Sequence, residues 1–548
     1  MADDKKLKGF NNDFGFGRTD RVDIKAMPLR VQAIGAFGGA NHFDGARAID
    51  AHDFDAVLAK LAPRLVLQVE NLLGTGKTLD VDLTFKSIKD FEPTSLAARI
   101  PGLDAVAEFA RRAKGLADGS LKPAQFKEGL SQFSSVPKLQ AALDAVLERM
   151  GGAPRPAPAS SDGGLDSLFA MVDEKKEAPS GSAVAAFAGS LSTGKAGLDV
   201  SGAQKQAEKL LADQLKLITA EPALNALEAA WRGLHLFCRK GKGARIEVVD
   251  AVPGNELEAW QAATQDELAG TNEVPLGLAL LATPVTNDAA GNALLHELGD
   301  YAGQLQAPVV FEAGEAFLGM TLPELAKLDH PGAQFDTPAF DKWRSLRDKD
   351  ESRWLVAAVN PFVLRAGLWG SPVWLVGASV AQSMQRTGWP TQHTGAGDGE
   401  VEQLKTHAHD GGEFPLQAIL PDRHLKDLTR AGFTPLICQA NHDSAWVILA
   451  PTVHRPSRAE EEGKMGSLAY QLLAARLGEA VMRGKARLMQ ADTAEAAQAF
   501  EEYAKAVVSD TGPGHDAAAL VREDSIELHI RTGREVLNGA ELQFQIPV

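Results

Sequence analysis

Apolar residues recur in two different periods along residues 221–252, and this stretch predicts a helix that leads into a strand. Pro222 suits the first helical position, where its missing N–H has no intrahelical partner to lose. The following apolar residues recur at spacings of three and four and share one helix face: Leu224, Leu227, Trp231, Leu234 and Cys238. Beyond them, Ile246 and Val248 alternate with charged residues, as in a strand with one buried side. We therefore expect Leu227, Trp231 and Leu234 to be core anchors of an α/β domain.

The same periods predict further strands and helices on both sides of this stretch. Strands are expected at residues 27–37, 65–69, 79–85, 276–285, 309–312, 526–530 and 542–546. Helices are expected at residues 53–61, 123–150, 203–219 and 287–304, the last with Asn287 as its N-cap. Further helices are expected in the stretch that ends at about residue 117, in a segment that begins at residue 256, and within residues 459–508. Strands that alternate with helices of roughly 10–18 residues indicate a mixed α/β fold, in which mixed sheets are flanked by helices.

A linker is expected at residues 151–190, which are rich in Pro, Ala, Gly and Ser. Within it, residues 164–175 predict a short amphipathic helix whose apolar stripe has the spacing i, i+3, i+4, i+7: Leu165, Leu168, Phe169 and Val172. Such a stripe either docks on its own domain or enters the groove of a partner. The predicted organisation is a flexible N-terminus (1–27), a first domain (28–150), the linker and a second domain (191–548).

Composition and charge narrow the class of protein. The chain has 548 residues, a net charge of -16 and a sequence pI of about 5.4, which disfavours a nucleic-acid-binding surface. Its two cysteines, Cys238 and Cys438, lie in apolar runs and are expected to be buried thiols in a reducing compartment. No run of about 18 apolar residues and no apolar signal-peptide core is present, so we expect a cytoplasmic protein without direct membrane insertion.

Three motifs could carry chemistry, and each has a simpler interpretation. The stretch GTGKT (residues 74–78) lacks the first glycine of a phosphate loop and joins two predicted strands, so it opens no helix. The stretch STGKAG (residues 192–197) lies beside the linker and is interpreted in the same way. His407, His409 and Asp410 could be metal ligands, but Asp410 would point away from the two histidines on a strand, which favours a solvated loop. We therefore expect no catalytic, cofactor or metal site.

The first 150 residues contain motifs of a known family. A strand ending in phenylalanine, the turn Asp90-Phe91-x-Pro93 and a helix that opens near Ile100-Pro101 follow one another along residues 83–116. This arrangement resembles the small subunit of the contractile sheath of type VI secretion systems.

The second domain resembles the large subunit of the same sheath. The motifs are LEAAWRGLHLF (residues 227–237), a Trp-x-x-x-Arg helix within 340–365, the helix and Gly-Trp stop of 369–390, and Gly432-Phe433-x-Pro435-Leu436. Two subunits of one heterodimer thus resemble successive parts of a single chain. Two features depart from the family pattern: residues 473–488 lack its aromatic Arg-Phe-x-His helix, and the large-subunit part is short.

The resemblance implies a structural protein of the contractile-sheath fold. It implies a helical homopolymer around an inner tube of hexameric rings, which contracts on a baseplate anchored in the bacterial membrane. It also implies that terminal strands are exchanged between protomers, with Leu542, Phe544 and Ile546 as the candidate strand. The alternative for that strand is an internal hairpin with residues 525–531. By the same resemblance, the linker helix is a candidate recognition site for an AAA+ unfoldase that disassembles the sheath. The alternative function is a non-polymerising homologue that acts as an adaptor or cap on the baseplate side.

Overall fold

The computed structural model describes Lys25 and residues 27–150, 200–270, 272, 274–409, 411–458, 460, 465–489 and 493–547. The predicted linker helix, the STGKAG stretch and Asp410 lie outside these residues. Contacts divide the chain into two compact units, each built from separate segments. Unit 1 comprises Met1–Phe37, Phe43–Phe54 and Ala229–Val548, and unit 2 comprises Gly38–His42 and Asp55–Glu228. The domain ranges expected from the sequence do not follow this division and stay a prediction.

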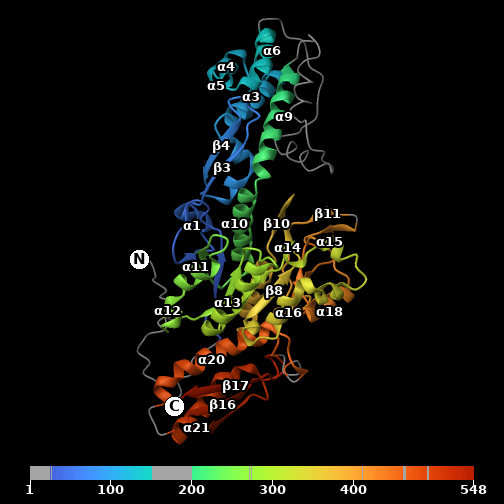
Figure 1. Ribbon diagram of the computed structural model, residues 1–548. Coiled ribbons are helices and arrows are strands. Elements are labelled where there is room, and N and C mark those ends of the chain that lie inside the picture. Colours follow the sequence, from blue (N-terminus) through green and yellow to red (C-terminus); the bar gives the residue numbers. More distant parts are fainter. Residues whose placement is uncertain are drawn as a thin grey trace, which may run out of the picture. The chain divides into compact units, whose positions relative to one another are not determined.

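Unit 1 is organised around an eight-stranded mixed sheet (Figure 1). Its strands, in spatial order, are β14 (Trp446–Val447), β13 (Phe433–Ile437), β8 (Leu355–Val359), β7 (Val309–Glu312), β6 (Leu276–Leu281), β1 (Arg30–Gly35), β5 (Arg245–Asp250) and β2 (Ala46–Ile49). The two edge strands, β14 and β2, are antiparallel to their neighbours, and the six between them are parallel. The first strand in sequence is therefore a central strand, held on both sides by strands more than 200 residues away.

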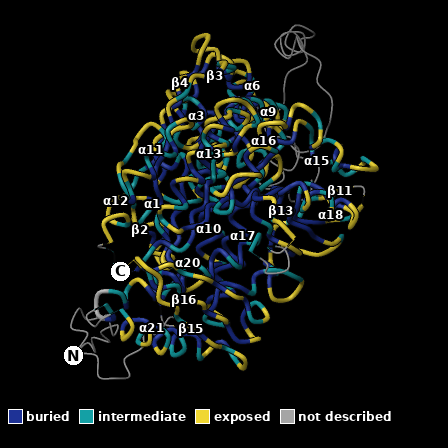
Figure 2. The backbone as a smooth tube through the Cα atoms, turned by 60° about the horizontal axis from the view of Figure 1, so that its bottom comes forward, coloured by how far each residue is buried: buried dark blue, intermediate teal, exposed yellow. Residues whose placement is uncertain are grey.

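Helices cover both faces of this sheet. One face buries a core against α11 (Glu256–Ala263), α13 (Ala289–Leu305), α16 (Asp341–Arg347) and α18 (Asp422–Arg430). The other face is covered by α10 (Pro222–Lys240) and α17 (Val373–Thr387), where Gly377 brings α17 so close that an added Cβ would lie 2.6 Å from Leu280. Ala279 and Leu281 belong to the first core while Leu280 faces α17, as the alternation of side chains along a strand requires. In Figure 2 the tube around α10 and α17 is largely dark blue, because α17 buries nearly its whole length.

Shorter elements connect these layers. They are α12 (Gln265–Leu268), α14 (Glu315–Leu318), α15 (Leu322–Leu325), the 3-10 turns η3 (Pro331–Asp336), η4 (Pro338–Phe340) and η5 (Asp350–Trp354), and the hairpins β9–β10 (Phe362–Arg365, Leu368–Gly370) and β11–β12 (His407–His409, Gly412–Phe414).

The last part of unit 1 has a core of its own. The helices α20 (Leu468–Leu488) and α21 (Thr493–Val508) pack on an antiparallel sheet of order β15-β16-β17 (Figure 1, red). The strands are β15 (Asp516–Val521), β16 (Ser525–Arg531) and β17 (Glu541–Pro547), and the turn η6 (Ser509–Thr511) precedes them.

Unit 2 consists of one hairpin and a helical layer. The hairpin is β3 (Arg64–Glu70) with β4 (Thr78–Thr84), and α3 (Leu103–Ala117) packs along α9 (Val200–Thr219). Gln214 of α9 is fully buried and binds the hairpin end, accepting from the Leu72 N–H at 2.7 Å and donating to the Glu70 carbonyl at 2.8 Å. The remaining elements are α1 (Phe54–Leu61, of which Phe54 belongs to unit 1), η1 (Ile88–Phe91), α2 (Pro93–Arg99), α4 (Pro123–Lys127), α5 (Leu130–Phe133), η2 (Pro137–Leu139) and α6 (Gln140–Met150).

The mixed α/β fold expected from the sequence is confirmed, and several element bounds are corrected. The helix expected at residues 123–150 is divided into α4, α5, η2 and α6. The N-cap of α13 is Asp288, whose carboxylate accepts from the Gly291 N–H at 2.8 Å, and not Asn287. The helix beginning at Pro222 and the strand at residues 309–312 lie where they were predicted. Along the described residues, no helix is both long enough and apolar enough to cross a membrane.

Candidate functional site

The central strand β1 is held by a buried polar network at its first residues. The Arg30 guanidinium donates from Nε and Nη2 to the two carboxylate oxygens of Glu247 on β5, each at 2.9 Å, and also pairs with Glu267 of α12. Gln32, fully buried, donates to Glu247 at 3.0 Å and accepts from the indole of Trp260 at 3.0 Å. Burial alone lowers the pKa of Arg30, but the two glutamates outweigh it and hold the pKa above its usual value. The network thus fixes the register of β1 between its neighbours.

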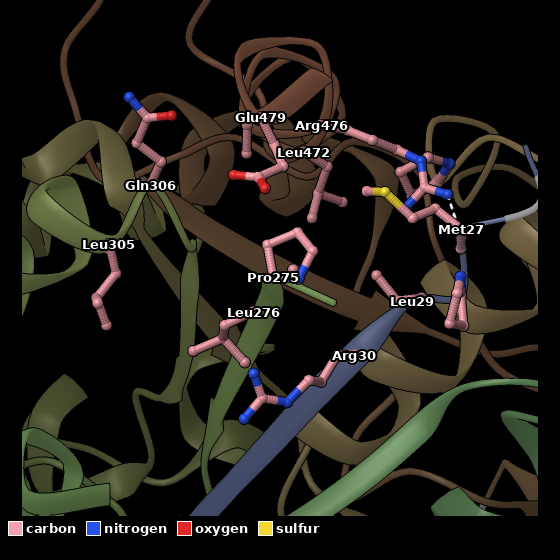
Figure 3. A pocket seen from close by; sticks show the side chains of 14 residues that line it. Met27, Leu29, Arg30, Pro275, Leu276, Leu305, Gln306, Leu472, Arg476 and Glu479 are labelled. Atoms are coloured by element: carbon pink, nitrogen blue, oxygen red, sulfur yellow. Dashed lines mark hydrogen bonds between the residues drawn. The ribbon is translucent and has the colours of Figure 1, made fainter. Parts of the chain in front are cut away.

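A small cavity of about 40 Å³ lies beside the start of β1, where it meets α20 (Figure 3). Arg476 of α20 reaches across it and donates to the Met27 carbonyl, and Glu479 and Leu472 point into the same space. Met27, three residues before the start of β1, is therefore bound to the C-terminal part of unit 1.

Trp231 anchors the end of the same strand. Its indole Nε1 donates to the Phe37 carbonyl at 2.9 Å, and its ring packs edge-on against Phe37 and Phe54 with centroids 5.5 and 5.9 Å away. Gly233 lies two residues further along α10 and leaves room for the side chain of Trp374. A Cβ added at Gly233 would lie 2.2 Å from the indole nitrogen of Trp374. The structure buries all three residues expected as core anchors, with exposed fractions of 3% for Leu227 and 0% for Trp231 and Leu234.

The family-like motifs around residues 343 and 432 meet at the end of α18. The Trp343 indole donates to the Ala431 carbonyl at 2.9 Å, and Arg347, one turn later, donates to the Arg430 carbonyl at 2.7 Å and to that of Val453 at 3.0 Å. Both side chains therefore satisfy carbonyls at or next to the helix end, where the helix itself leaves them unbonded. Burial lowers the pKa of Arg347 to about 10. The spacing Trp-x-x-x-Arg is explained by this joint cap.

The glycine of the second motif makes the cap possible. Gly432 has φ +91°, and a Cβ there would lie 2.6 Å from the Arg347 Nε. The next residue, Phe433, stacks on Trp343 with centroids 5.1 Å apart and planes at 16°. The sequence identified these residues only as family motifs; the structure shows that they form one packed cluster.

The phosphate-loop-like stretch is the connection between β3 and β4, as expected. Asn71 closes the loop by donating from Nδ2 to the Thr75 hydroxyl at 2.8 Å and from its backbone N–H to the Lys77 carbonyl at 3.1 Å. The loop leads directly into β4 and opens no helix of its own. The turn η2 packs beside it, where the Lys138 N–H donates to the Leu73 carbonyl at 3.2 Å.

The two histidines lie on a short hairpin instead of a loop. His407 and His409 are on β11 with ring centroids 6.4 Å apart, and His407 packs edge-on against Trp369 and Phe414. His407 Nε2 is 2.7 Å from the Leu416 carbonyl. Across the described ranges, no group of three or more His, Cys, Asp or Glu side chains is arranged to hold a metal.

The candidate exchange strand pairs within its own chain. β17 is antiparallel to β16, with Leu542, Phe544 and Ile546 opposite Ile530, Leu528 and Ile526. Leu542 and Ile546 are buried in the C-terminal core, and Phe544 packs against it. These three side chains thus face the core and are not available to a neighbouring copy. Among the described residues, the outer backbone edge of β17 pairs with no further strand.

Comparison with known families assigns both parts of the chain. Residues 20–148 match the family described as "Type VI secretion system, VipA, VC_A0107 or Hcp2". Residues 203–368 and 365–454 match VipB, described as "EvpB/VC_A0108, tail sheath N-terminal domain". The chain belongs to the type VI secretion sheath family. It carries a VipA-type and a VipB-type part in that order, and the predicted fusion of small and large subunits is confirmed.

Individual sheath proteins show the same division. The chain is 23% identical over 317 residues to the type VI secretion system sheath protein TssC1 of Pseudomonas aeruginosa, a match covering 49% of this chain and 63% of the relative. It is 30% identical over 109 residues to TssB1 of the same organism, covering 20% of this chain and 59% of the relative. The chain thus spans about three fifths of each curated relative. A solved sheath tail protein of Desulfitobacterium hafniense is similar with 12% identity and a TM-score of 0.32, over 52% of this chain and 60% of that one.

Proposed function

We propose that this protein is the structural subunit of a type VI secretion sheath in which small and large subunits are joined. It polymerises as a helical tube around an inner tube of ring proteins, and contraction of the polymer propels that inner tube. The role is structural and non-enzymatic. The proposal is supported by the two sheath-family parts that follow one another in one chain.

The observation that carries the proposal is the position of β1. This strand comes from the VipA-type part, and its neighbours β5 and β6 come from the VipB-type part. The two parts therefore share one sheet and are complete only together. Joining them in one chain fixes a one-to-one ratio and makes their association intramolecular.

Open strand edges supply a means of connecting protomers. Within the described residues, no further strand pairs with the outer strands of the C-terminal sheet, β15 and β17. Side chains bind single positions there: the Ala519 N–H of β15 donates to Glu501, and the Tyr470 hydroxyl donates to the Glu541 carbonyl of β17. An unpaired edge accepts a strand from another chain through main-chain hydrogen bonds, and such a link tolerates rigid-body movement of the protomers. We propose that copies of this chain are connected at these edges.

The remaining partners follow from the proposed role. They are the inner-tube ring protein, components of a membrane-anchored baseplate and, through the linker helix with Leu165, Leu168, Phe169 and Val172, an AAA+ unfoldase. The proposed location is the bacterial cytoplasm, with the polymer docked on the baseplate.

Negative-stain electron microscopy of the purified chain, alone and with its inner-tube protein, tests the main proposal. Tubes with a regular helical repeat are expected. A chain that stays monomeric at high concentration in the presence of the inner-tube protein would contradict a sheath role.

A baseplate-side adaptor or cap is the second candidate. It is favoured by the C-terminal helix α20, where residues 473–488 lack the aromatic Arg-Phe-x-His run of the sheath pattern. Discrete rings or capped complexes in the same micrographs would support this function over the first.

A further inference from the structure

Charge is divided sharply along the VipB-type part. Residues 232–245 contain five Lys or Arg and no acid, whereas residues 246–326 contain thirteen Asp or Glu and no Lys or Arg. The boundary falls at the start of β5. The two blocks belong to unit 1, so their places in the fold can be compared.

The basic block ends on an exposed turn. Arg239, Lys242 and Arg245 are exposed where α10 leads into β5. Lys240, next to them, is partly buried: burial and then the adjacent Arg239 lower its pKa, and its ammonium donates to Gln403 at 3.2 Å. Four cations lie within seven residues of a chain of net charge -16. Glu402 and Asp443 are near enough to act on Lys240, so the turn keeps an excess of positive charge that they offset only in part. We refer to residues 239–245 as the basic turn.

The acidic block forms a surface hollow. A depression of about 540 Å³ lies among α11, α12 and α13, and no Lys or Arg lines it. Glu297 and Asp300 are exposed at its side, and within the described residues neither carboxylate takes part in an ion pair. Leu268, 53% exposed, and Leu257 give the hollow an apolar part. We refer to this depression as the acidic hollow.

The two features cannot satisfy each other within one copy. The basic turn ends α10, which covers one face of the eight-stranded sheet, whereas α11 and α13 cover the opposite face. Complementary patches on different faces suit a head-to-tail contact. In such a contact, the basic turn of each copy meets one neighbour and its acidic hollow meets another. Such heterologous contacts build rings or open helical filaments.

We propose that the basic turn of one copy of this chain docks in the acidic hollow of the next copy. Opposite charges offset the repulsion expected between subunits that are each strongly acidic, and the leucines contribute apolar contact. This inference deepens the proposed sheath role, because it names a surface by which copies meet.

Cross-linking tests the contact without requiring tubes. A Lys242→Cys chain mixed with a Glu297→Cys chain should form an oxidised dimer of unlike chains. Mixing Lys426→Cys with Glu297→Cys is the matched control, since Lys426 is an exposed lysine on α18. The native Cys238 and Cys438 interfere little, because burial raises the pKa of their thiols to about 12 and about 11. At least tenfold more dimer than in the control is expected; equal yields would overturn the proposal.

Charge reversal gives an independent readout of assembly. Lys242→Glu and Glu297→Lys should each raise the concentration needed for sedimentable polymer about tenfold, and the double reversal should restore it. A double variant as defective as either single variant would refute the pairing, as would single variants that assemble normally. Loss of inner-tube binding with intact self-assembly would indicate a different occupant and would also overturn it. If the cysteine variants form the specific cross-link but the wild-type chain forms no tubes, the result would instead count against the sheath role alone.

Discussion

The buried carboxyl of Glu312 should make the stability of unit 1 depend on pH. Glu312 ends β7 in the middle of the sheet and is 8% exposed. Burial raises its pKa from 4.5 to about 7, and the neighbouring Ser371 side chain offsets only part of this effect. The folded protein therefore holds a proton there at pH values where the unfolded chain has lost it.

The sign and size of the effect follow from the two pKa values. Below about pH 4.5 the carboxyl is neutral in both states and costs nothing. Between pH 4.5 and 7 only the unfolded chain ionises, so the free energy of unfolding falls as the pH rises. Since each pH unit corresponds to about 1.4 kcal/mol, the full cost above pH 7 is about 3 kcal/mol.

The substitution Glu312→Gln removes this cost with little change in shape. The variant should unfold at the same urea concentration as the wild type near pH 4.5 and be more stable by about 3 kcal/mol at pH 8. Tryptophan fluorescence is a suitable readout, because all eight tryptophans belong to unit 1. Glu258→Gln, at an exposed position on α11, is the matched control. The reasoning would be refuted if the free energies of unfolding of Glu312→Gln and wild type differed by the same amount at every pH. It would also be refuted if they did not differ at pH 8.

Three further predictions concern other parts of the chain. Cutting the chain at a protease site introduced within residues 151–199 should leave the two fragments bound in size-exclusion chromatography, because β1 is a central strand; separation under native conditions would contradict the shared sheet. Gly432→Ala should lower the free energy of unfolding by more than about 1 kcal/mol, because Gly432 has a positive φ and the Arg347 side chain lies close to it. Gly411→Ala is the control: no atom lies within 4 Å of a Cβ added there, so its free energy of unfolding should be unchanged in the same urea titration. Cys238 and Cys438 should react with a thiol reagent only after unfolding, which absorbance at native pH can follow; rapid labelling of the folded chain would show that they are accessible.

Local periodicity was sufficient for most individual elements. The helix from Pro222 and the strand at residues 309–312 were predictable because each carries its own apolar pattern. β15 was missed, since its sequence DAAALV contains three alanines and a single β-branched residue, and therefore shows little of the usual strand signature. Its structure depends on pairing with β16, which is not encoded within the six residues themselves.

The arrangement of the elements depends on contacts distant in sequence. Nothing within residues 27–37 indicates that the strand lies between β5 and β6. A partial signal was present in Arg30 and Gln32, two polar residues in an otherwise apolar strand, which called for buried partners such as Glu247. Trp231 was predictable as an anchor from helix periodicity, but its bond to the Phe37 carbonyl was not.

The central position of β1 also has a consequence for synthesis. Its neighbouring strand β5 begins at Arg245, about 210 residues after Gly35 at the end of β1. At typical translation rates of roughly 5–20 residues per second, β1 leaves the ribosome some tens of seconds before either neighbouring strand exists. An unpaired apolar strand of this kind is prone to wrong pairing with other nascent chains. Because its partners arrive on the same chain, the correct pairing then proceeds at the same rate at any concentration of the protein in the cell.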